Sequence, residues 1–358
     1  MKTRIHSREI LLFWVASVFV VLNQSAFAEM IYVNVRVGKD NNSGTKKAPF
    51  QTLHRAAEKI RNRNQSGPTT IKVAPGIYNL TECVEFYSSQ PYTETDRLVI
   101  EAEILPDDPR WKPALMPILL STEDPRKDDD LNGLTATYSI QVKLSHVTIR
   151  GLKFLGNPLL NNWHCCVERI VEDLNDLVVT QCLFLGDKDT CHIYCATLAT
   201  GDGFIVDHCI FRRCHACTVY WDGPQSITSK HCSMRYCIVD GAYISGVWTC
   251  RTAEDFEFRH NIVTNSEYFW MRERINNPRT YRVLDCIITN NNHYSGYGVE
   301  NGPTGRTGPE VTYKDQNIIK EGNISFIVDK RARNYLHPVP NTLGSDLGAG
   351  LFNKPKEK

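Results

Sequence analysis

The chain has 358 residues, with 41 lysines and arginines against 40 aspartates and glutamates, and 13 cysteines. This near-neutral balance gives no support for nucleic acid or an anionic membrane surface as a partner. The length alone allows one large domain or two ordinary ones, and the internal repeats favour a single elongated domain.

The first 28 residues have the features of a secretory signal. They start with three basic residues, continue with the apolar run Ile10 to Leu22, and end in Ala26-Phe27-Ala28, a small-x-small cleavage pattern. The run is shorter than the about 20 residues that a membrane span needs. We predict cleavage after Ala28 and a secreted or periplasmic protein without a membrane span; an uncleaved anchor is the alternative.

Residues 29–82 are predicted to form an N-terminal cap and the first coil of the fold. Ile31 to Val37 is strand-like, and Pro49-Phe50 is expected to open a helix, because proline suits a first helical turn. The apolar face of this helix is formed by Leu53, Ala56, Ala57 and Ile60. Such a helix can cover the open end of a solenoid.

Residues 83–140 have the least regular pattern, with four prolines between Leu105 and Pro117. We predict irregular coils or an insertion here, which serves either as extra capping or as one side of a cleft.

Residues 141–331 contain six copies of one short pattern, at spacings of 30, 27, 28, 24 and 25 residues. The copies end at Phe154, Phe184, Phe211, Val239, Val263 and Ile288. Two residues earlier stand Leu152, Cys182, Cys209, Cys237, Asn261 and Cys286. Five residues before each end stand Ile149, Val179, Val206, Met234, Phe258 and Val283. Such repeats predict a solenoid in which each coil buries its apolar columns against its neighbours. Asn317 to Phe326 is interpreted as a seventh copy, with Asn323 in the cysteine column.

The cysteines are interpreted from this repeat. An exported protein with 13 cysteines would normally form disulfides, but four of them share one inward column, so we predict a ladder of buried free thiols. Cys214-His215-Ala216-Cys217 and Cys191-His192 leave a zinc site or a disulfide as alternatives. No cofactor is predicted; calcium is the alternative, through Asp187, Asp189, Asp202 and Asp207.

Residues 332–358 are rich in proline, glycine and lysine, and we expect a closing tail that is partly disordered.

Several segments resemble those of one known group. They are Gly38-Lys39-Asp40, Ser43-Gly44-Thr45, Ala48-Pro49-Phe50-Gln51-Thr52-Leu53, Ala74-Pro75-Gly76-Ile77-Tyr78 and Val147 to Phe154. They are similar to secreted right-handed parallel β-helix proteins of the pectate-lyase-like superfamily, which includes many uncharacterised bacterial members. The resemblance implies an all-β, right-handed parallel β-helix with an N-terminal capping helix and a substrate groove on one face. It does not single out a reaction, because this scaffold has lyases, hydrolases, epimerases and non-catalytic binders.

The register of the copies predicts a polar patch beside the cysteine column. Equivalent residues of neighbouring coils stand about 4.8 Å apart, so residues one and two places before that column come together. The catalytic candidates are Asp207, His208, Arg235, Tyr236, Arg259 and His260. Arginine can pair with a uronate carboxylate while histidine or tyrosine moves the proton. The alternative is a surface of ordinary ion pairs.

A second column, nine residues after the end of each copy, is rich in aromatic residues. The substrate-binding candidates in and beside it are Tyr220, Trp221, Asp222, Trp248, Trp270 and Arg272. An alternative catalytic site combines His192, Tyr220, Asp222, Trp248, Arg272 and Glu300. Aromatic rings can stack on sugars, but alternation along a strand turns half of them inward, so core packing is the competing interpretation.

We therefore predict a carbohydrate-active, monomeric protein that acts on an extracellular polysaccharide. Lyase chemistry on a uronate polymer is placed slightly ahead of glycoside hydrolysis. The alternative is a non-catalytic glycan-binding surface or matrix protein.

Overall fold

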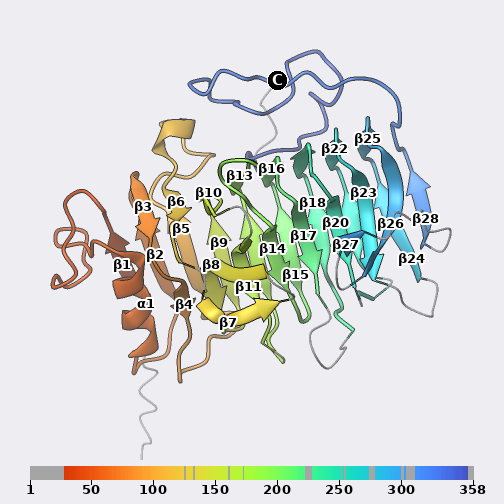
Figure 1. Ribbon diagram of the computed structural model, residues 1–358. Coiled ribbons are helices and arrows are strands. Elements are labelled where there is room, and N and C mark those ends of the chain that lie inside the picture. Colours follow the sequence, from red (N-terminus) through yellow and green to blue (C-terminus); the bar gives the residue numbers. More distant parts are fainter. Residues whose placement is uncertain are drawn as a thin grey trace, which may run out of the picture.

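The computed structural model of the chain describes residues 28–124, 126–131, 134–159, 162–171, 173–221, 228–250, 252–253, 255–273, 279–299, 302–303 and 311–353. Except for Ala28, the predicted signal peptide lies outside these residues. Three sheets of mostly parallel strands run side by side along the length of a single solenoid (Figure 1). The predicted fold class, a right-handed parallel β-helix with a capping helix, is confirmed. The described part of the chain contains no helix long and apolar enough to cross a membrane.

Each complete coil contributes one strand to each sheet, whereas β1 and β28 belong to the first sheet at the two ends of the solenoid. The first sheet contains β1 (Glu29–Val33), β2 (Thr69–Val73), β5 (Leu98–Ala102), β9 (Val147–Arg150), β12 (Leu177–Thr180), β15 (Phe204–Asp207), β18 (Ser233–Arg235), β21 (Glu257–Arg259), β24 (Arg279–Leu284) and β28 (Val311–Gln316). The second sheet contains β3 (Ile77–Leu80), β6 (Ile118–Ser121), β10 (Lys153–Leu155), β13 (Leu183–Leu185), β16 (Ile210–Arg212), β19 (Ile238–Asp240), β22 (Ile262–Thr264) and β25 (Ile287–Thr289).

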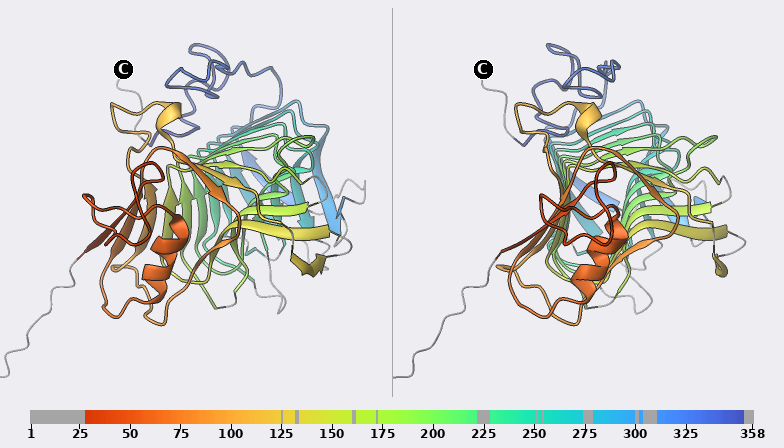
Figure 2. Two further views of the ribbon diagram at one scale, coloured as in Figure 1. Left: turned by 60° about the vertical axis from the view of Figure 1, so that its left-hand side comes forward. Right: turned by 90° about the vertical axis from the view of Figure 1, so that its left-hand side faces the viewer.

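The third sheet contains β4 (Val84–Phe86), β8 (Leu134–Val142), β11 (Asn162–Arg169), β14 (Cys195–Ala199), β17 (Ala216–Tyr220), β20 (Ser245–Thr249), β23 (Tyr268–Glu273), β26 (His293–Val299) and β27 (Gly302–Pro303). Two of its pairings are antiparallel: β27 with β26, and β7 (Arg126–Leu131) with β8. Figure 2 shows β7 standing out from the side of the solenoid.

The observed register is the one that the repeat predicts. Val179 pairs with Val206 in the first sheet, and Phe184 pairs with Phe154 and Phe211 in the second. These side chains are fully buried in the core. The three phenylalanine rings stack at centroid distances of 4.9 Å, close to the spacing of neighbouring strands.

A two-residue turn joins the first sheet to the second. Its first residue is in the left-handed region, with φ between 48° and 54° in five successive coils, at Gln181, His208, Tyr236, His260 and Asp285. Each of these N–H groups donates to a carbonyl of the following coil at 2.8–3.2 Å. The second turn residue points inward and forms the predicted thiol ladder; its sulfur donates to a nearby backbone carbonyl, as Cys237 does to Arg235 at 3.1 Å. All 13 cysteines are free.

The seventh copy begins earlier than the sequence suggested. Its first-sheet strand is β28, and Asn317 then takes the left-handed turn position with a φ of 55°. Ile319 pairs with Ile287 of the second sheet. Ile318, and not Asn323, therefore follows Asn317 in the place of the cysteine column, so that assignment was wrong.

A helix covers the N-terminal end of the core, as predicted (Figure 2). It is α1 (Leu53–Arg61), whose residues Leu53, Ala56, Ala57 and Ile60 are buried. It starts after Pro49-Phe50 rather than at them, because Thr52 is its N-cap and accepts a hydrogen bond from the Arg55 N–H at 3.2 Å. The Asp40 carboxylate fixes this start by accepting from the N–H groups of Gln51 and Thr52, both at 2.9 Å.

The C-terminal segment 326–353, here called the strap, is packed rather than disordered. It returns along the solenoid over the second sheet (Figure 1). There it covers an outward apolar row formed by Leu183, Ile210, Ile238, Ile262 and Ile287. Arg333 donates to the carbonyls of Pro106 (2.9 Å) and Trp111 (3.1 Å), near the 3-10 helix η1 (Pro113–Leu115). The tail was expected to be partly disordered because its composition is polar, whereas the apolar row that it covers lies far away in the sequence.

The thiol ladder predicts a chemical titration. Denatured protein should react with close to 13 equivalents of a thiol reagent, because each sulfur is free. The native protein should react slowly, since all but Cys191 are buried. A count of seven or fewer in denaturant would show that disulfides hold this core.

Asn261 interrupts the cysteine column and predicts a stability difference. Its side chain is fully buried, accepts from the Cys237 N–H and donates to the Met234 carbonyl, both at 2.8 Å. Asn261→Ala leaves the Cys237 N–H without its acceptor and removes one donor to the Met234 carbonyl, so it should lower the free energy of unfolding by about 1–3 kcal/mol. Asn261→Cys restores the residue of the neighbouring coils and should lose less. Equal shifts of the urea midpoint for both variants would contradict this account.

Candidate functional site

The six catalytic candidates lie together on the ridge between the first and second sheets; we call them the turn patch. Asp207, Arg235 and Arg259 pair in successive strands of the first sheet. The rings of His208 and Tyr236 stack at 4.7 Å, and those of Tyr236 and His260 meet edge to face at 4.7 Å. The structure therefore places Asp207, His208, Arg235, Tyr236, Arg259 and His260 as the register predicts, and their role is a proposal taken up below.

Charged groups of the turn patch lie close to one another. His208 Nδ1 is 3.0 Å from Asp207 Oδ1, but the two are not aligned for a hydrogen bond. Arg235 Nε lies 3.8 Å from the same oxygen. Burial and the neighbouring Arg259 charge lower the pKa of His260. The patch thus holds a neutral imidazole beside an arginine, which suits proton transfer next to an anion.

The strap borders the turn patch on one side. Gly350 donates its N–H to the Tyr236 carbonyl at 2.8 Å, and Gln181 donates to the Leu351 carbonyl at 2.8 Å. His208 is only 8% exposed. Because the turns have two residues, the patch is a ridge with one flank and not a groove.

The outer face of the third sheet carries a second apolar cluster, whose central residues are themselves buried. Residues that alternate along its strands belong to two separate clusters: Cys166, Ala196 and Cys217 pack in the core, whereas Cys165, Cys195 and Ala216 belong to a second cluster. Since successive side chains of a strand point to opposite faces, the second cluster lies outside. A second register row of the same cluster runs through Leu198, Val219, Trp248 and Met271.

Aromatic side chains gather at one border of this outer face. Trp163 and Tyr194 approach with ring centroids 4.4 Å apart, and Tyr194 lies 4.2 Å from His215. Trp163 donates its indole N–H to Cys165 Sγ at 3.2 Å. Trp163 and Tyr194 are half-buried at the start of their strands, whereas Trp221, also half-buried, follows β17 at the opposite border of the face. The connections that leave the third sheet differ in length, from four residues between Ala199 and Phe204 to twelve between Tyr220 and Ser233.

Several predicted substrate-binding residues point elsewhere. Tyr220 is 1% exposed in the core and donates to the Ser233 carbonyl at 2.7 Å. Trp270 is fully buried in the same core, and Arg272 is 3% exposed. Tyr220 and Trp270 cannot stack on a ligand, so that prediction was wrong for them. Arg272 pairs with Thr249 in the register row of Tyr220, away from the outer row.

The error has a physical cause. The connection from the second to the third sheet varies in length between coils, so a constant offset from the end of each copy does not keep one register. Trp248 is 8% exposed in the outer cluster, where Trp221 also packs. His192 lies 5.8 Å from His215, ring to ring, beside the aromatic border. Asp222 and Glu300 lie outside the described residues.

Two carboxylates on the outer face escaped the sequence analysis. Glu85 pairs with Gln141, which pairs with Glu168, so the two glutamates are two strands apart in one outward row. Two strand spacings amount to roughly 9.5 Å. Lys143 Nζ is 3.3 Å from Glu85, whose side chain is 27% exposed, whereas Glu168 is 6% exposed.

A third carboxylate, that of Glu123, lies near Cys83 together with Glu85 and Glu168. Burial, and then the charges of Glu123, Glu85 and Glu168, raise the pKa of the Cys83 thiol, which shows that the three carboxylates surround it. The sequence signal was the alternation Val84-Glu85-Phe86 and Ile140-Gln141-Val142, with the polar residue facing outward. It lay partly in the segment interpreted as irregular.

Among the described residues, no group of three or more histidine, cysteine, aspartate or glutamate side chains is arranged to hold a metal ion.

Two histidines near the aromatic border are held neutral. His164 is fully buried, with Nδ1 2.9 Å from Thr137 Oγ1 and Nε2 3.2 Å from Ser139 Oγ. Burial, reinforced by the nearby His192, lowers the pKa of His164 to about 3, and the same two causes lower the pKa of His215 to about 3.

These histidines predict acid sensitivity. The unfolded chain protonates them near pH 6.5 and the folded chain only near 3, so the free energy of unfolding should fall as the pH drops below 6.5. Each contributes a slope of up to about 1.4 kcal/mol per pH unit. His215→Phe should remove about half of this joint slope between pH 6.5 and 5. His231→Gln, at a side chain that is 77% exposed, is the control. An unchanged slope in His215→Phe would contradict the assignment.

Known proteins resemble the chain in fold. No protein-family model matches the chain, and no curated protein sequence matches it. A rhamnogalacturonan lyase structure is 12% identical, covering 90% of this chain and 99% of the other, with a TM-score of 0.41. A pectin methylesterase in complex with a hexasaccharide is 10% identical, with 89% and 96% covered and a TM-score of 0.44. A GH136 lacto-N-biosidase from Eubacterium ramulus is 8% identical, with 82% and 68% covered and a TM-score of 0.37.

At these identities the likeness concerns the fold alone. The fold is therefore assigned from the structure of this chain. Its three parallel sheets form one solenoid in the register that the sequence repeat predicts. The chain is a parallel β-helix protein of the kind that its resemblance to the pectate-lyase-like superfamily implied.

Proposed function

We propose that this protein is carbohydrate-active and binds a polysaccharide along the outer face of the third sheet. The observation that carries the proposal is the pair of half-buried rings of Trp163 and Tyr194 at one border of this face, with Trp221 half-buried at the opposite border. Sugar rings present apolar C–H faces that pack on aromatic side chains, and hydroxyl groups around them need polar partners such as Gln141. The proposal includes export of a monomer, which the signal-like residues 1–28 support.

The same face carries groups for hydrolysis of the bound chain. Glycoside hydrolysis needs two carboxyl groups, and inversion needs them about 6.5–9.5 Å apart, with one acting as acid and the other as base. Glu85 and Glu168 are two strands apart in one outward row. Their surroundings differ, since Glu168 is buried, whereas Glu85 is half-buried and ion-paired with Lys143. Two carboxyl groups in different environments can act as general acid and general base in one reaction. We therefore assign Glu168 as the acid and Glu85 as the base.

The turn patch supports a second candidate, β-elimination of a uronate polymer. Arg235 or Arg259 would pair with the uronate carboxylate, and Tyr236 or His260 would take the proton beside it. The stacked rings of His208, Tyr236 and His260 favour this candidate because they fix the proton-transfer groups. We place it second because the patch is a ridge, whereas a polymer needs a flanked surface to be held through the reaction.

A binding experiment tests whether the polysaccharide contacts the third sheet. In affinity electrophoresis with a panel of acidic and neutral polysaccharides, Trp163→Ala should weaken retention by at least about tenfold, because a ring that stacks on the sugar is lost. Phe352→Ala, a partly buried aromatic of the strap, is the matched control and should retain the polysaccharide. Equal retention by both variants would contradict binding at the third sheet.

Product analysis then separates the reactions. Hydrolysis predicts new reducing ends without the ultraviolet absorbance of an unsaturated uronate. Glu168→Gln and Glu85→Gln should each lower this rate about 10²-fold or more, while Tyr236→Phe leaves it unchanged. Absorbance that Tyr236→Phe abolishes would instead establish elimination at the turn patch. Retention of the polysaccharide without any reaction product would indicate a non-catalytic binding protein.

A further inference from the structure

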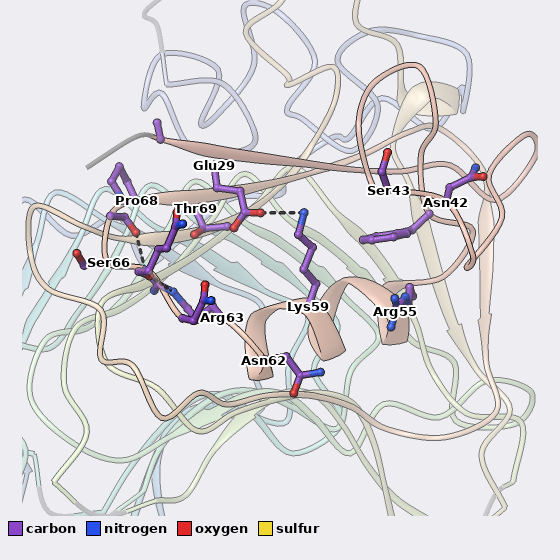
Figure 3. A pocket seen from close by; sticks show the side chains of 15 residues that line it. Glu29, Asn42, Ser43, Arg55, Lys59, Asn62, Arg63, Ser66, Pro68 and Thr69 are labelled. Carbon is purple, nitrogen blue, oxygen red and sulfur yellow. Dashed lines mark hydrogen bonds and ion pairs between the residues drawn. The ribbon is translucent and has the colours of Figure 1, made fainter. Parts of the chain in front are cut away.

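A cavity of about 610 Å³ lies between α1 and the start of β1 (Figure 3). Its cations already have partners within the chain. Arg55 pairs with Glu58, and Arg63 donates to two carbonyls of the loop that follows α1. Lys59 pairs with Glu29 at 2.8 Å. Among the described lining residues no cation is left for an acidic ligand, so these contacts stabilise the N-terminal cap.

Two cysteines of the outer cluster stand side by side on the third sheet. Cys165 of β11 pairs in register with Cys195 of β14, and both belong to the cluster outside the core. Equivalent residues of neighbouring strands lie about 4.8 Å apart, and disulfides join Cα atoms that are about 4.4–6.8 Å apart. The Cβ atoms of a disulfide are about 3.5–4.5 Å apart, so the two side chains need to approach by about 1 Å or less. A disulfide can therefore form here without a change of register.

The thiol ladder is bonded differently from this outer pair. Each ladder S–H donates to the carbonyl two residues earlier, at 3.3 Å in Cys182 and 3.1 Å in Cys237. These sulfurs lie in the closed core, where the loss of such a hydrogen bond costs free energy. In the described part of the chain, neither Cys165 nor Cys195 donates to a carbonyl. We therefore expect the outer pair to oxidise in preference to the ladder.

The surroundings of Cys165 determine when it can react. Its sulfur accepts a hydrogen bond from the Trp163 indole N–H at 3.2 Å. Burial raises the pKa of the Cys165 thiol well above its usual value and the adjacent Cys195 adds to this effect, whereas the Trp163 N–H acts in the opposite direction. Because the thiolate is the attacking species, the finished fold should oxidise slowly. The predicted export brings the chain to an oxidising compartment, so the bond is expected to form while the coils assemble.

We propose that Cys165 and Cys195 are a modification site, at which a small disulfide oxidant links β11 to β14 by a disulfide. One cysteine thiolate attacks the S–S bond of the oxidant, releases one thiol and forms a mixed disulfide. The second cysteine thiolate then displaces the other thiol of the oxidant. The two cysteines lose two electrons and two protons, which the two thiols of the reduced oxidant take up.

The disulfide lies beside the aromatic border. Trp163 stands two residues before Cys165, Tyr194 directly precedes Cys195, and the two ring centroids are 4.4 Å apart. A cross-link between the two strands fixes the spacing of these rings, and preorganised groups bind a ligand more tightly. The disulfide itself does not depend on sugar binding, whereas this consequence rests on the proposed function.

Refolding of the reduced full chain with a mixture of oxidised and reduced glutathione tests the site. The thiol count in denaturant should fall from 13 to 11, and a peptide map without reductant should link the segments of Cys165 and Cys195. Cys165→Ser and Cys195→Ser should each keep all 12 remaining thiols. Cys166→Ala, at the neighbouring residue that packs in the core, is the matched control and should still lose two. Thermal unfolding of each reduced variant checks that the coils are intact.

The outcomes separate this proposal from the proposed function. A count of 13 after oxidation, or a loss of two thiols in Cys195→Ser, would overturn the modification site. In affinity electrophoresis the polysaccharide should retain the oxidised protein at least about threefold more strongly than the reduced protein. Equal retention of the two forms would overturn the effect on the aromatic border, and no retention of either form would contradict the proposed function instead.

Discussion

Each coil of this protein is stable only because it lies in register on the next one. The strands are short, often three to five residues, and the apolar columns of a coil are buried between its neighbours. A shift of one residue would turn Val179 and Val206 outward and bring Thr180 and Asp207 into the core. The left-handed turn residues reinforce the register, because their N–H groups bond to the following coil. Coil spacing near 4.8 Å therefore sets the distance between functional groups as well.

Apolar surface that no neighbouring coil covers must be covered by other segments of the chain. Two devices do this here. At the N-terminal end α1 lies across the core, fixed by its Thr52 cap and by Asp40. Over the second sheet the strap covers the outward row that includes Ile238 and Ile262. With the second sheet covered, the partly exposed aromatic side chains around the outer cluster of the third sheet are the surface that we propose for a polymer.

The two candidate surfaces differ in how the chain surrounds them. The turn patch follows from a turn of two residues, so its side chains stand on a ridge and are ordered mainly by stacking on each other. The outer face of the third sheet lies between connections of variable length, and its row passes from Glu85 and Glu168 to Leu198 and Trp248. A surface that is acidic at one end and apolar at the other can hold a glycan and place carboxyl groups beside it.

The sequence by itself determined the solenoid, the register of the first and second sheets, the thiol ladder and the turn patch. These features depend on a constant spacing of two to seven residues within one copy, which the backbone converts directly into position. Only the tertiary structure decided which aromatic residues of the third sheet face outward, because the preceding connection changes length from coil to coil and shifts Tyr220 and Trp270 into the core. It also decided the path of the strap and the meeting of Glu85 with Glu168. Glu85 and Glu168 stand 83 positions apart, and Gly344 of the strap stands 57 positions after Ile287, which it contacts. No local pattern in the chain encodes such a distance.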